Sequence, residues 1–275
     1  MDLKILALNI IANQGFGPDH DTLMNGFMKM AEKMAGPGTE VTLGYPEKGC
    51  RPMAGVLYPG ITAMANAHTV ERVIQAEEEG YDAVIILAAT DEGLLRARAA
   101  VNIPVTSTGE ASIYVAQLLG HRFGIVVVDP VMPAIIESNL RQYGFRDNAL
   151  GLRPVRVAMI EHLDMVDACR EKPERLIEKF EKVAWELIRD GADVIIAGES
   201  YIGPAFSLAG YTEIPKANVP LVDCGAAALK MAELLAALHK SLGLRKSNAR
   251  TSPYRTPDKA LLDKARSYYF GKTEK

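Results

Sequence analysis

The stretch DGADVIIAGESY, residues 190–201, decides the fold that the sequence predicts. A short run of Val, Ile and Ala bounded by turn-forming residues is typical of a strand buried on both faces. This strand carries Glu199, Ser200 and Tyr201 to its C-terminal end, where open parallel sheets usually bind their ligands. A poorly hydrated carboxyl group tends to have a raised pKa, so Glu199 is the first candidate for proton transfer.

The stretch AEEEGYDAVIILA, residues 76–88, has the same layout: a helix end, a glycine, an aspartate two residues later, and an apolar run. The eighth residue after Gly80 is Ala88, and the eighth residue after Gly191 is Glu199. We therefore expect two similar halves with a cleft between them, a position that ligand pockets favour. One of the two equivalent strand ends would be inert and the other acidic.

Composition excludes several classes of protein. With 275 residues, of which 48% are hydrophobic and 24% charged, the chain can bury a large core. Its net charge of -3 gives no reason to expect nucleic acid or an anionic membrane as a partner. No apolar run approaches the roughly 20 residues that cross a bilayer. The first nine residues lack the features of a signal peptide, so we expect a cytoplasmic protein.

The sequence indicates neither a metal site nor a cofactor. Cys50, Cys169 and Cys224 lie far apart without a C-x-x-C motif, so we expect three buried cysteines and no structural zinc. Gly15-x-Gly17 lacks the rest of a phosphate-binding fingerprint. We therefore expect a protein that works without cofactors.

Strands alternate with helices along the whole chain, which predicts a parallel α/β sheet in each of two halves related by a pseudo-two-fold axis. We expect residues 1–105 and 220–244 in the first half and residues 106–219 in the second. Residues 45–61 are expected to form a loop before a helix over 69–79. Tyr58 in this loop either covers a ligand or is simply solvated.

The C-terminal segment, residues 245–275, is polar and basic but carries several aromatic residues. Aromatic side chains such as Tyr254, Tyr268 and Tyr269 would be costly in water. We therefore expect an arm that wraps its own subunit or a neighbour, and we expect the chain to form a homo-oligomer.

Several motifs at preserved spacings then carry a resemblance to a known family. They are Gly80-Tyr81-Asp82-Ala83-Val84, Asp91-x-Gly93-Leu94, Gly109-Glu110-Ala111, Tyr143-Gly144, Asp190-Gly191-Ala192 and Val219-Pro220-Leu221-Val222-Asp223 with the alanines that follow. Together they resemble the aspartate/glutamate/hydantoin racemase superfamily, and its hydantoin racemase branch most of all, from about residue 3 to about residue 244.

The resemblance implies one catalytic cysteine at the end of each paired strand. Those positions are Ala88 and Glu199 here, so neither thiol is present. Asn9 matches the first-strand asparagine of the family, while the second asparagine falls at Ile11. Because alanine cannot move a proton, two-base racemisation with these two positions is not expected. A single acid/base remains, as in the similar arylmalonate decarboxylases, which keep a reactive residue only at the second position.

The leading hypothesis is a cofactor-independent lyase or isomerase acting at a carbon next to a carboxylate or carbonyl. The expected substrate is a small carboxylate or a cyclic amide, with Glu199 as acid/base. The hydroxyl of Thr90 and the Thr108-Gly109 turn would stabilise the oxyanion, with help from Tyr201. The expected substrate-binding residues are Asn9, Ala88, Thr108, Gly109, Ser200 and Tyr58.

Two alternatives stay open. In a hydrolase of a cyclic amide or lactone, Glu199 would activate water, and Thr90, Ser200 or Tyr201 would position it. In a binding protein that has kept the cleft without the reaction, Glu199 would only recognise a ligand.

Overall fold

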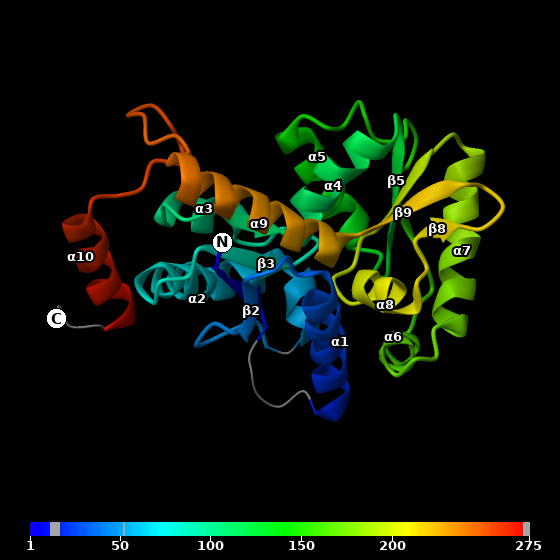
Figure 1. Ribbon diagram of the computed structural model, residues 1–275, viewed down its shortest axis with the longest axis horizontal. Helices are drawn as coiled ribbons and strands as arrows, with labels where there is room; N and C mark the ends of the chain where they lie inside the picture. Colours follow the sequence, from blue (N-terminus) through cyan, green and yellow to red (C-terminus); the bar gives the residue numbers. More distant parts are fainter. Residues whose placement is uncertain (12–16, 52, 272–275) are drawn as a thin grey trace.

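The structure contains two sheets with nearly the same strand order (Figure 1). This computed structural model describes residues 1–11, 17–51 and 53–271. The first sheet has the order β2-β1-β3-β4, and its strands are β1 (Leu3–Asn9), β2 (Thr39–Gly44), β3 (Ala83–Leu87) and β4 (Val105–Ser107). The second has the order β6-β5-β7-β9-β8, and its strands are β5 (Phe123–Val127), β6 (Val155–Val157), β7 (Val194–Ala197), β8 (Glu213–Ile214) and β9 (Val219–Asp223).

All strand pairs are parallel except the pair formed by β8 and β9. In both sheets the first strand along the chain lies between the second and the third. The predicted fold class, two parallel-sheet α/β halves of similar design, is confirmed.

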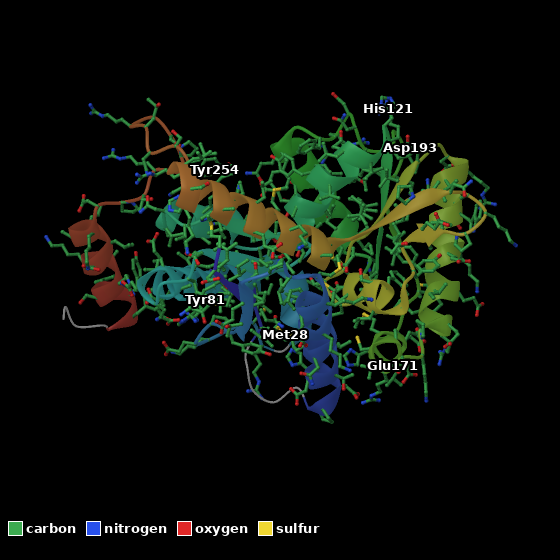
Figure 2. All side chains as sticks on the ribbon, viewed as in Figure 1. Met28, Tyr81, His121, Glu171, Asp193 and Tyr254 are labelled. Atoms are coloured by element: carbon green, nitrogen blue, oxygen red, sulfur yellow. The ribbon has the colours of Figure 1, made fainter. Side chains whose placement is uncertain are left out.

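The repeated Gly-x-Asp motif has a structural cause. Asp82 accepts a hydrogen bond from the backbone N–H of Lys4 at 2.8 Å. Asp193 accepts two, from the backbone N–H groups of His121 at 2.9 Å and Arg122 at 2.7 Å. Figure 2 shows His121 and Asp193 at the same end of the second sheet. Each aspartate therefore ties the start of its own strand to the start of the first strand in its sheet, away from the ends where ligands are expected.

Helices connect the strands. They are α1 (Pro18–Met34), the 3₁₀ helix η1 (Met53–Leu57), α2 (Pro59–Glu78), α3 (Leu94–Ala100), α4 (Thr108–Leu119), α5 (Met132–Tyr143), α6 (His162–Cys169), α7 (Glu174–Arg189), α8 (Ile202–Ala209), α9 (Cys224–Leu242) and α10 (Lys259–Phe270). None of the helices in the described ranges has the length and apolar composition that crossing a bilayer requires.

The predicted start of the second long helix is wrong. α2 begins at Pro59, not at Thr69, so the expected loop over 45–61 ends earlier. Proline is well suited to the first position of a helix because its backbone angle is already helical and its missing N–H would have no partner there. The residues that follow include three alanines, which favour helix, so the proline that suggested a loop in fact begins a helix.

The expected boundaries of the two halves also need correction. β4 pairs with β3 in the first sheet, so residues 106 and 107 do not belong to the second half. β9 pairs with β7 in the second sheet, so residues 220–223 do not belong to the first half. Helix α9, which follows β9, does pack against β1, β3 and β4. The chain thus crosses between the halves at the end of β9, where the sequence shows only an ordinary strand-to-helix junction.

The largest hydrophobic core contains residues from both sheets. Ile85 of the first sheet and Ile125 and Ile196 of the second belong to one cluster, together with alanines from α4 and α9. Figure 1 shows these two helices crossing the middle of the molecule. Small alanine side chains let the helices approach the strands closely, and the two sheets are held in one packed core.

Residues 245–271 contact their own subunit, which is one of the two arrangements expected for the C-terminal segment. Arg266 of α10 donates from two nitrogens to Glu71 of α2, both at 2.9 Å, and from a third to Glu78 at 2.6 Å. Thr256 donates its hydroxyl to the backbone carbonyl of Val101 at 3.3 Å. Residues 245–271 therefore lie along the outer side of the first half.

Candidate active site

Glu199 stands at the end of β7, as the sequence predicts. The preceding residue, Gly198, donates its N–H to the carbonyl of Val126 in β5 at 2.9 Å. A Cβ atom at Gly198 would lie 2.5 Å from a methyl carbon of Ile125, so only glycine allows this approach. After Glu199 the chain turns into α8, and the N–H of Ile202 donates to the Glu199 carbonyl at 3.2 Å. Packing on β5 and the start of α8 thus fix the backbone of Glu199.

The surroundings of Glu199 change the acidity of its carboxyl group. The pKa of this group is raised to about 7. Burial is the main cause and the negative charge of Glu92 adds to it, while hydrogen bonds from the backbone N–H groups of Tyr201 and Ser200 act in the opposite direction. With a pKa near neutrality, both protonation states are populated at neutral pH. Such a group is suited both to removing and to donating a proton.

At the equivalent position after β3, the side chain itself cannot be titrated. Ala88 is buried and presents only a methyl group. Its carbonyl accepts hydrogen bonds from the hydroxyl of Ser107 at 2.9 Å and from the N–H of Asp91 at 3.0 Å. These bonds draw the chain after β3 into a tight turn.

Thr90 in this turn is bound to a neighbouring carboxylate. Its hydroxyl donates to the Glu92 side chain, and its carbonyl accepts from the amide of Asn139 at 2.9 Å. The expected role of Thr90 in stabilising an oxyanion stays a prediction, because in this structure the hydroxyl is occupied by Glu92.

Glu92 is a further candidate for this site, which the sequence alone does not single out. Burial raises the pKa of its carboxyl, which hydrogen bonds from Thr90 and from a backbone N–H lower in part. Its charge in turn raises the pKa values of the Glu199 carboxyl and the Cys50 thiol. The sequence shows a carboxylate four residues after Ala88, but no local pattern places it beside Glu199.

Thr108 and Ser200 join the two halves beside Glu199. Their hydroxyl oxygens are 2.9 Å apart and both residues are buried. Gly109, at the start of α4, packs against the turn after β3: a Cβ atom there would lie 2.4 Å from the Ala89 carbonyl oxygen and 2.6 Å from a carboxylate oxygen of Asp91. The structure therefore brings the predicted Thr108-Gly109 turn next to both strand ends.

Asn9 and Tyr201 meet at the end of β1. The Asn9 amide donates to the sulfur of Met24 at 2.9 Å, and its oxygen accepts from the N–H of Ile11 at 3.2 Å. Burial and the Glu199 charge raise the pKa of the Tyr201 phenol, while a hydrogen bond with Asn9 lowers it. Tyr201 therefore stays protonated at neutral pH and can donate a hydrogen bond.

Tyr58 is not gathered into this cluster. It precedes α2 and is 62% exposed. Its expected role in covering a ligand stays a prediction.

All three cysteines are buried, as expected. Within the described ranges, no cluster of three or more His, Cys, Asp or Glu side chains is arranged to hold a metal ion.

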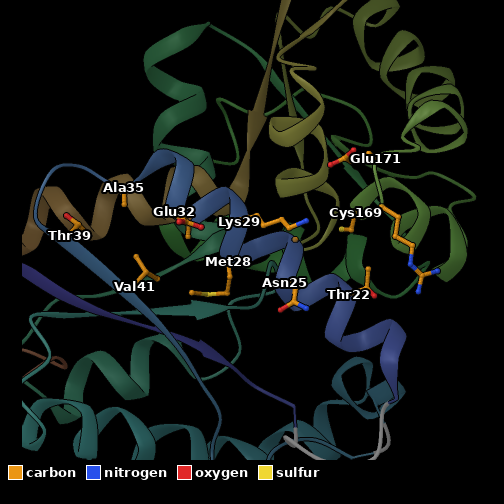
Figure 3. A pocket seen from close by; sticks show the side chains of 13 residues that line it. Thr22, Asn25, Met28, Lys29, Glu32, Ala35, Thr39, Val41, Cys169 and Glu171 are labelled. Carbon is orange, nitrogen blue, oxygen red and sulfur yellow. The ribbon is translucent and has the colours of Figure 1, made fainter.

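A pocket of about 690 Å³ lies elsewhere, along α1 (Figure 3). Figure 3 shows Met28 and Lys29 of α1 and Cys169 at the end of α6 among its lining residues. Burial raises the pKa of the Cys169 thiol to about 11, so this group stays protonated. None of the predicted site residues lines this pocket, and we assign it no part in the chemistry of the strand ends.

Comparisons with known proteins agree with this architecture. The sequence profile of the family described as Asp/Glu/Hydantoin racemase matches residues 22–232. A hydantoin racemase from Pseudomonas sp. (strain NS671) is 28% identical over 196 residues, which cover 69% of this chain and 70% of that protein. The structure of an allantoin racemase from Klebsiella pneumoniae has a TM-score of 0.74 at 25% identity and covers 94% of this chain and 95% of its own. An allantoin racemase from Pseudomonas fluorescens has a TM-score of 0.72 at 26% identity, with 93% and 97% covered.

Proposed function

Because the chain belongs to the Asp/Glu/hydantoin racemase family, we propose that it is a cofactor-independent isomerase that transfers a proton at a carbon next to a carbonyl or carboxylate, with Glu199 as acid/base. The observation that carries this proposal is the Glu199 carboxyl group at the end of β7, whose pKa burial raises to about 7. A carboxyl group with this pKa can remove a proton as carboxylate and return one as acid.

The substrate class follows from the relatives. They are described as racemases of hydantoin and allantoin, and both compounds are cyclic amides with a C–H bond between a carbonyl carbon and an amide nitrogen. Removal of that hydrogen gives an enolate whose charge rests on the carbonyl oxygen. We therefore propose a substituted hydantoin or a related cyclic amide as substrate.

Neighbouring groups would stabilise this oxyanion. The Tyr201 phenol stays protonated beside Glu199 and can donate a hydrogen bond. The first N–H groups of α4, at Thr108 and Gly109, are the second set of donors at this edge of the sheets. Hydrogen bonds aimed at the developing negative charge lower the barrier to proton removal.

Hydrogen exchange in deuterium oxide tests the proposal. Allantoin and hydantoins with one ring substituent are supplied as separate enantiomers, and proton NMR follows the loss of the ring C–H signal near neutral pD. We expect exchange above the enzyme-free rate and, in Glu199→Gln, a decrease of about 10²–10⁴ for the enantiomer whose C–H bond faces Glu199. Glu213→Gln is the matched control, because Glu213 is exposed on β8.

Two results would contradict the proposal. One is exchange of both enantiomers at the parental rate in Glu199→Gln. The other is the absence of enzyme-dependent exchange with every compound of the panel. A ring-opened product that carries labelled oxygen from water would instead identify a hydrolase.

A further inference from the structure

We propose that Glu92 is the second proton-transfer group of this site and faces the substrate from the first half, while Glu199 faces it from the second. The inference rests on the proposed function and extends it from proton exchange to inversion. It replaces the expectation of a single acid/base, which followed from Ala88 alone.

The turn after β3 holds Glu92 in a fixed place. Asp91 and Gly93, on either side of it, both have left-handed backbone conformations, with φ of 59° and 77°. The N–H of Leu94 donates to the Asp91 carbonyl at 3.2 Å, which closes the turn around Glu92. The Thr90 hydroxyl then binds the Glu92 carboxylate. The side chain is thus positioned at the same strand end as Ala88, although it starts four residues later.

The Thr90 hydroxyl holds the Glu92 carboxylate in the turn after β3, and two further groups are close enough to feel its charge. Its charge acts on the Glu199 carboxyl at the end of β7 and on the Cys50 thiol. Cys50 is bound through its backbone N–H to the carbonyl of Ile10, just after β1, at 2.9 Å. The carboxylate therefore lies among the ends of β1, β3 and β7, the three strands whose C-terminal ends meet at the proposed site.

The two carboxyl groups come from opposite halves. Glu92 follows β3 of the first sheet, and Glu199 follows β7, the corresponding strand of the second sheet. Groups so placed approach a bound carbon atom from two sides. This is the arrangement that inversion at carbon requires, because the proton must leave from one face and return to the other.

Repulsion between two nearby carboxylates favours a state with one shared proton. Burial acts in the same direction on both groups, since it raises the pKa of Glu92 and of Glu199. The state in which one group is a carboxylate and the other a carboxylic acid is therefore populated at neutral pH. In one turnover the carboxylate takes the proton from the C–H bond, and the electron pair stays on the substrate as an enolate. The acid then gives its proton to the opposite face of the carbon. The two groups exchange roles, and no oxidant or other reactant is needed.

Asp91 also has a buried carboxyl group whose pKa is raised to about 7, but its two oxygens accept hydrogen bonds from the N–H of Glu110 at 3.1 Å and from the Tyr143 hydroxyl at 3.0 Å. Two thiols and one phenol near the pair cannot act as the base either. Burial and the charges of Asp223 and Glu199 raise the pKa of the Cys224 thiol well above its ordinary value. This thiol donates to the Glu199 carbonyl at 3.4 Å. Burial and the Glu92 charge raise the pKa of Cys50, and the pKa of Tyr201 is also raised. All three stay protonated and cannot accept a proton from carbon at neutral pH.

The test separates exchange from inversion for each enantiomer. The same compounds are incubated in deuterium oxide with the parental protein, Glu92→Gln, Glu199→Gln and the control Glu213→Gln. Proton NMR measures exchange, and chiral chromatography measures inversion. Because each remaining group can still exchange the proton on its own face, we expect Glu92→Gln to lower inversion by about 10²–10⁴. Glu92→Gln should still exchange the proton of one enantiomer only, with retention of configuration. Glu199→Gln should do the same for the opposite enantiomer only.

If Glu92 had only a structural role, Glu92→Gln and Glu199→Gln would not prefer opposite enantiomers. Inversion at the parental rate in Glu92→Gln would overturn the inference and leave the role of Glu199 untouched. Loss of exchange for both enantiomers in a folded Glu92→Gln would also overturn it. Parental rates in both variants would overturn the proposed function itself.

A second measurement does not depend on turnover. In Glu92→Gln the pKa of Glu199 should fall, since a neighbouring negative charge is removed. An unchanged Glu199 titration in this variant would show that the two carboxyl groups do not interact and would overturn the inference. If Glu92→Gln does not fold, Glu92→Asp keeps the charge but shortens the reach, and it should lower inversion more than exchange. Equal losses in Glu92→Asp would contradict the role.

Discussion

The carboxyl group of Glu199 lies where its charged form is poorly solvated, and this affects the stability of the folded protein. The folded protein holds the Glu199 proton up to a pKa of about 7, whereas the ordinary value, which applies to the unfolded chain, is 4.5. Between these values the folded state binds more protons than the unfolded state. The free energy of unfolding therefore falls as pH rises through this interval and levels off above it.

Glu199→Gln removes this cost. We expect the variant to be more stable than the parental protein at about pH 8, by up to about 3 kcal/mol, with little or no gain at about pH 5. Urea unfolding at the two pH values measures the difference. An equal effect of the substitution on the free energy of unfolding at both pH values would show that folding does not raise the pKa of Glu199.

The position of Glu199 could be predicted from the sequence, while the position of Glu92 could not. Glu199 directly follows a buried strand, and a strand end is visible as a change from apolar to polar residues. Glu92 lies in a turn whose shape depends on the left-handed backbone of Asp91 and on contacts with Gly109. Those contacts join residues that are distant in sequence, so no local pattern reports them.

The turn after β3 packs so closely against Gly109 that no side chain fits there. A Cβ atom there would meet the Ala89 carbonyl, which belongs to the backbone and cannot rotate away. We expect Gly109→Ala to destabilise the protein by roughly 1–3 kcal/mol and to lower turnover, because the turn also carries Glu92. Gly60→Ala is the matched control: no atom lies within 4 Å of its added Cβ, and it stands in helix α2. This control should keep or raise the melting temperature, and a similar loss in both variants would refute the packing argument.

Among the helices, α10 is bound to α2 through the ion pairs of Arg266. Its Arg266 is 13% exposed and binds Glu71, whose side chain is 3% exposed. Breaking a buried ion pair by removing one partner costs roughly 3–5 kcal/mol, because a charge is left in a poorly solvated place.

We expect Arg266→Ala to detach α10 from α2 while the two sheets stay folded. Hydrogen exchange over residues 259–270 should become fast in the variant, and the rest of the chain should keep its protection. Arg255→Ala is the control, since Arg255 is exposed in the same C-terminal segment. Unchanged protection of α10 in Arg266→Ala would show that other contacts hold the helix in place.

The two halves share one core, and this determines how the whole molecule unfolds. Strand order and parallel pairing follow from the alternation of strands and helices, so the sequence was sufficient to predict two similar halves. It was not sufficient to predict where the chain crosses between them. β9 and α9 are continuous in sequence, yet one belongs to the second sheet and the other packs on the first.

Because residues of both sheets belong to one hydrophobic cluster, we expect the halves to unfold in a single transition. Trp185, the one tryptophan of the chain, lies in α7 and reports on the second half by fluorescence. Far-ultraviolet circular dichroism reports on both halves. Coincident urea transitions by the two methods are expected, and two separate midpoints would show that the halves are independent folding units.

The most direct test of the whole account is the titration of the Glu199 carboxyl in the intact protein. Carbon NMR of protein labelled at the glutamate side-chain carboxyl carbon, compared with Glu199→Gln to assign the signal, measures this pKa without a substrate. We expect a signal that titrates near 7, because burial is the main cause that raises this pKa to about 7. A Glu199 signal that titrates near the ordinary value of 4.5 would contradict it.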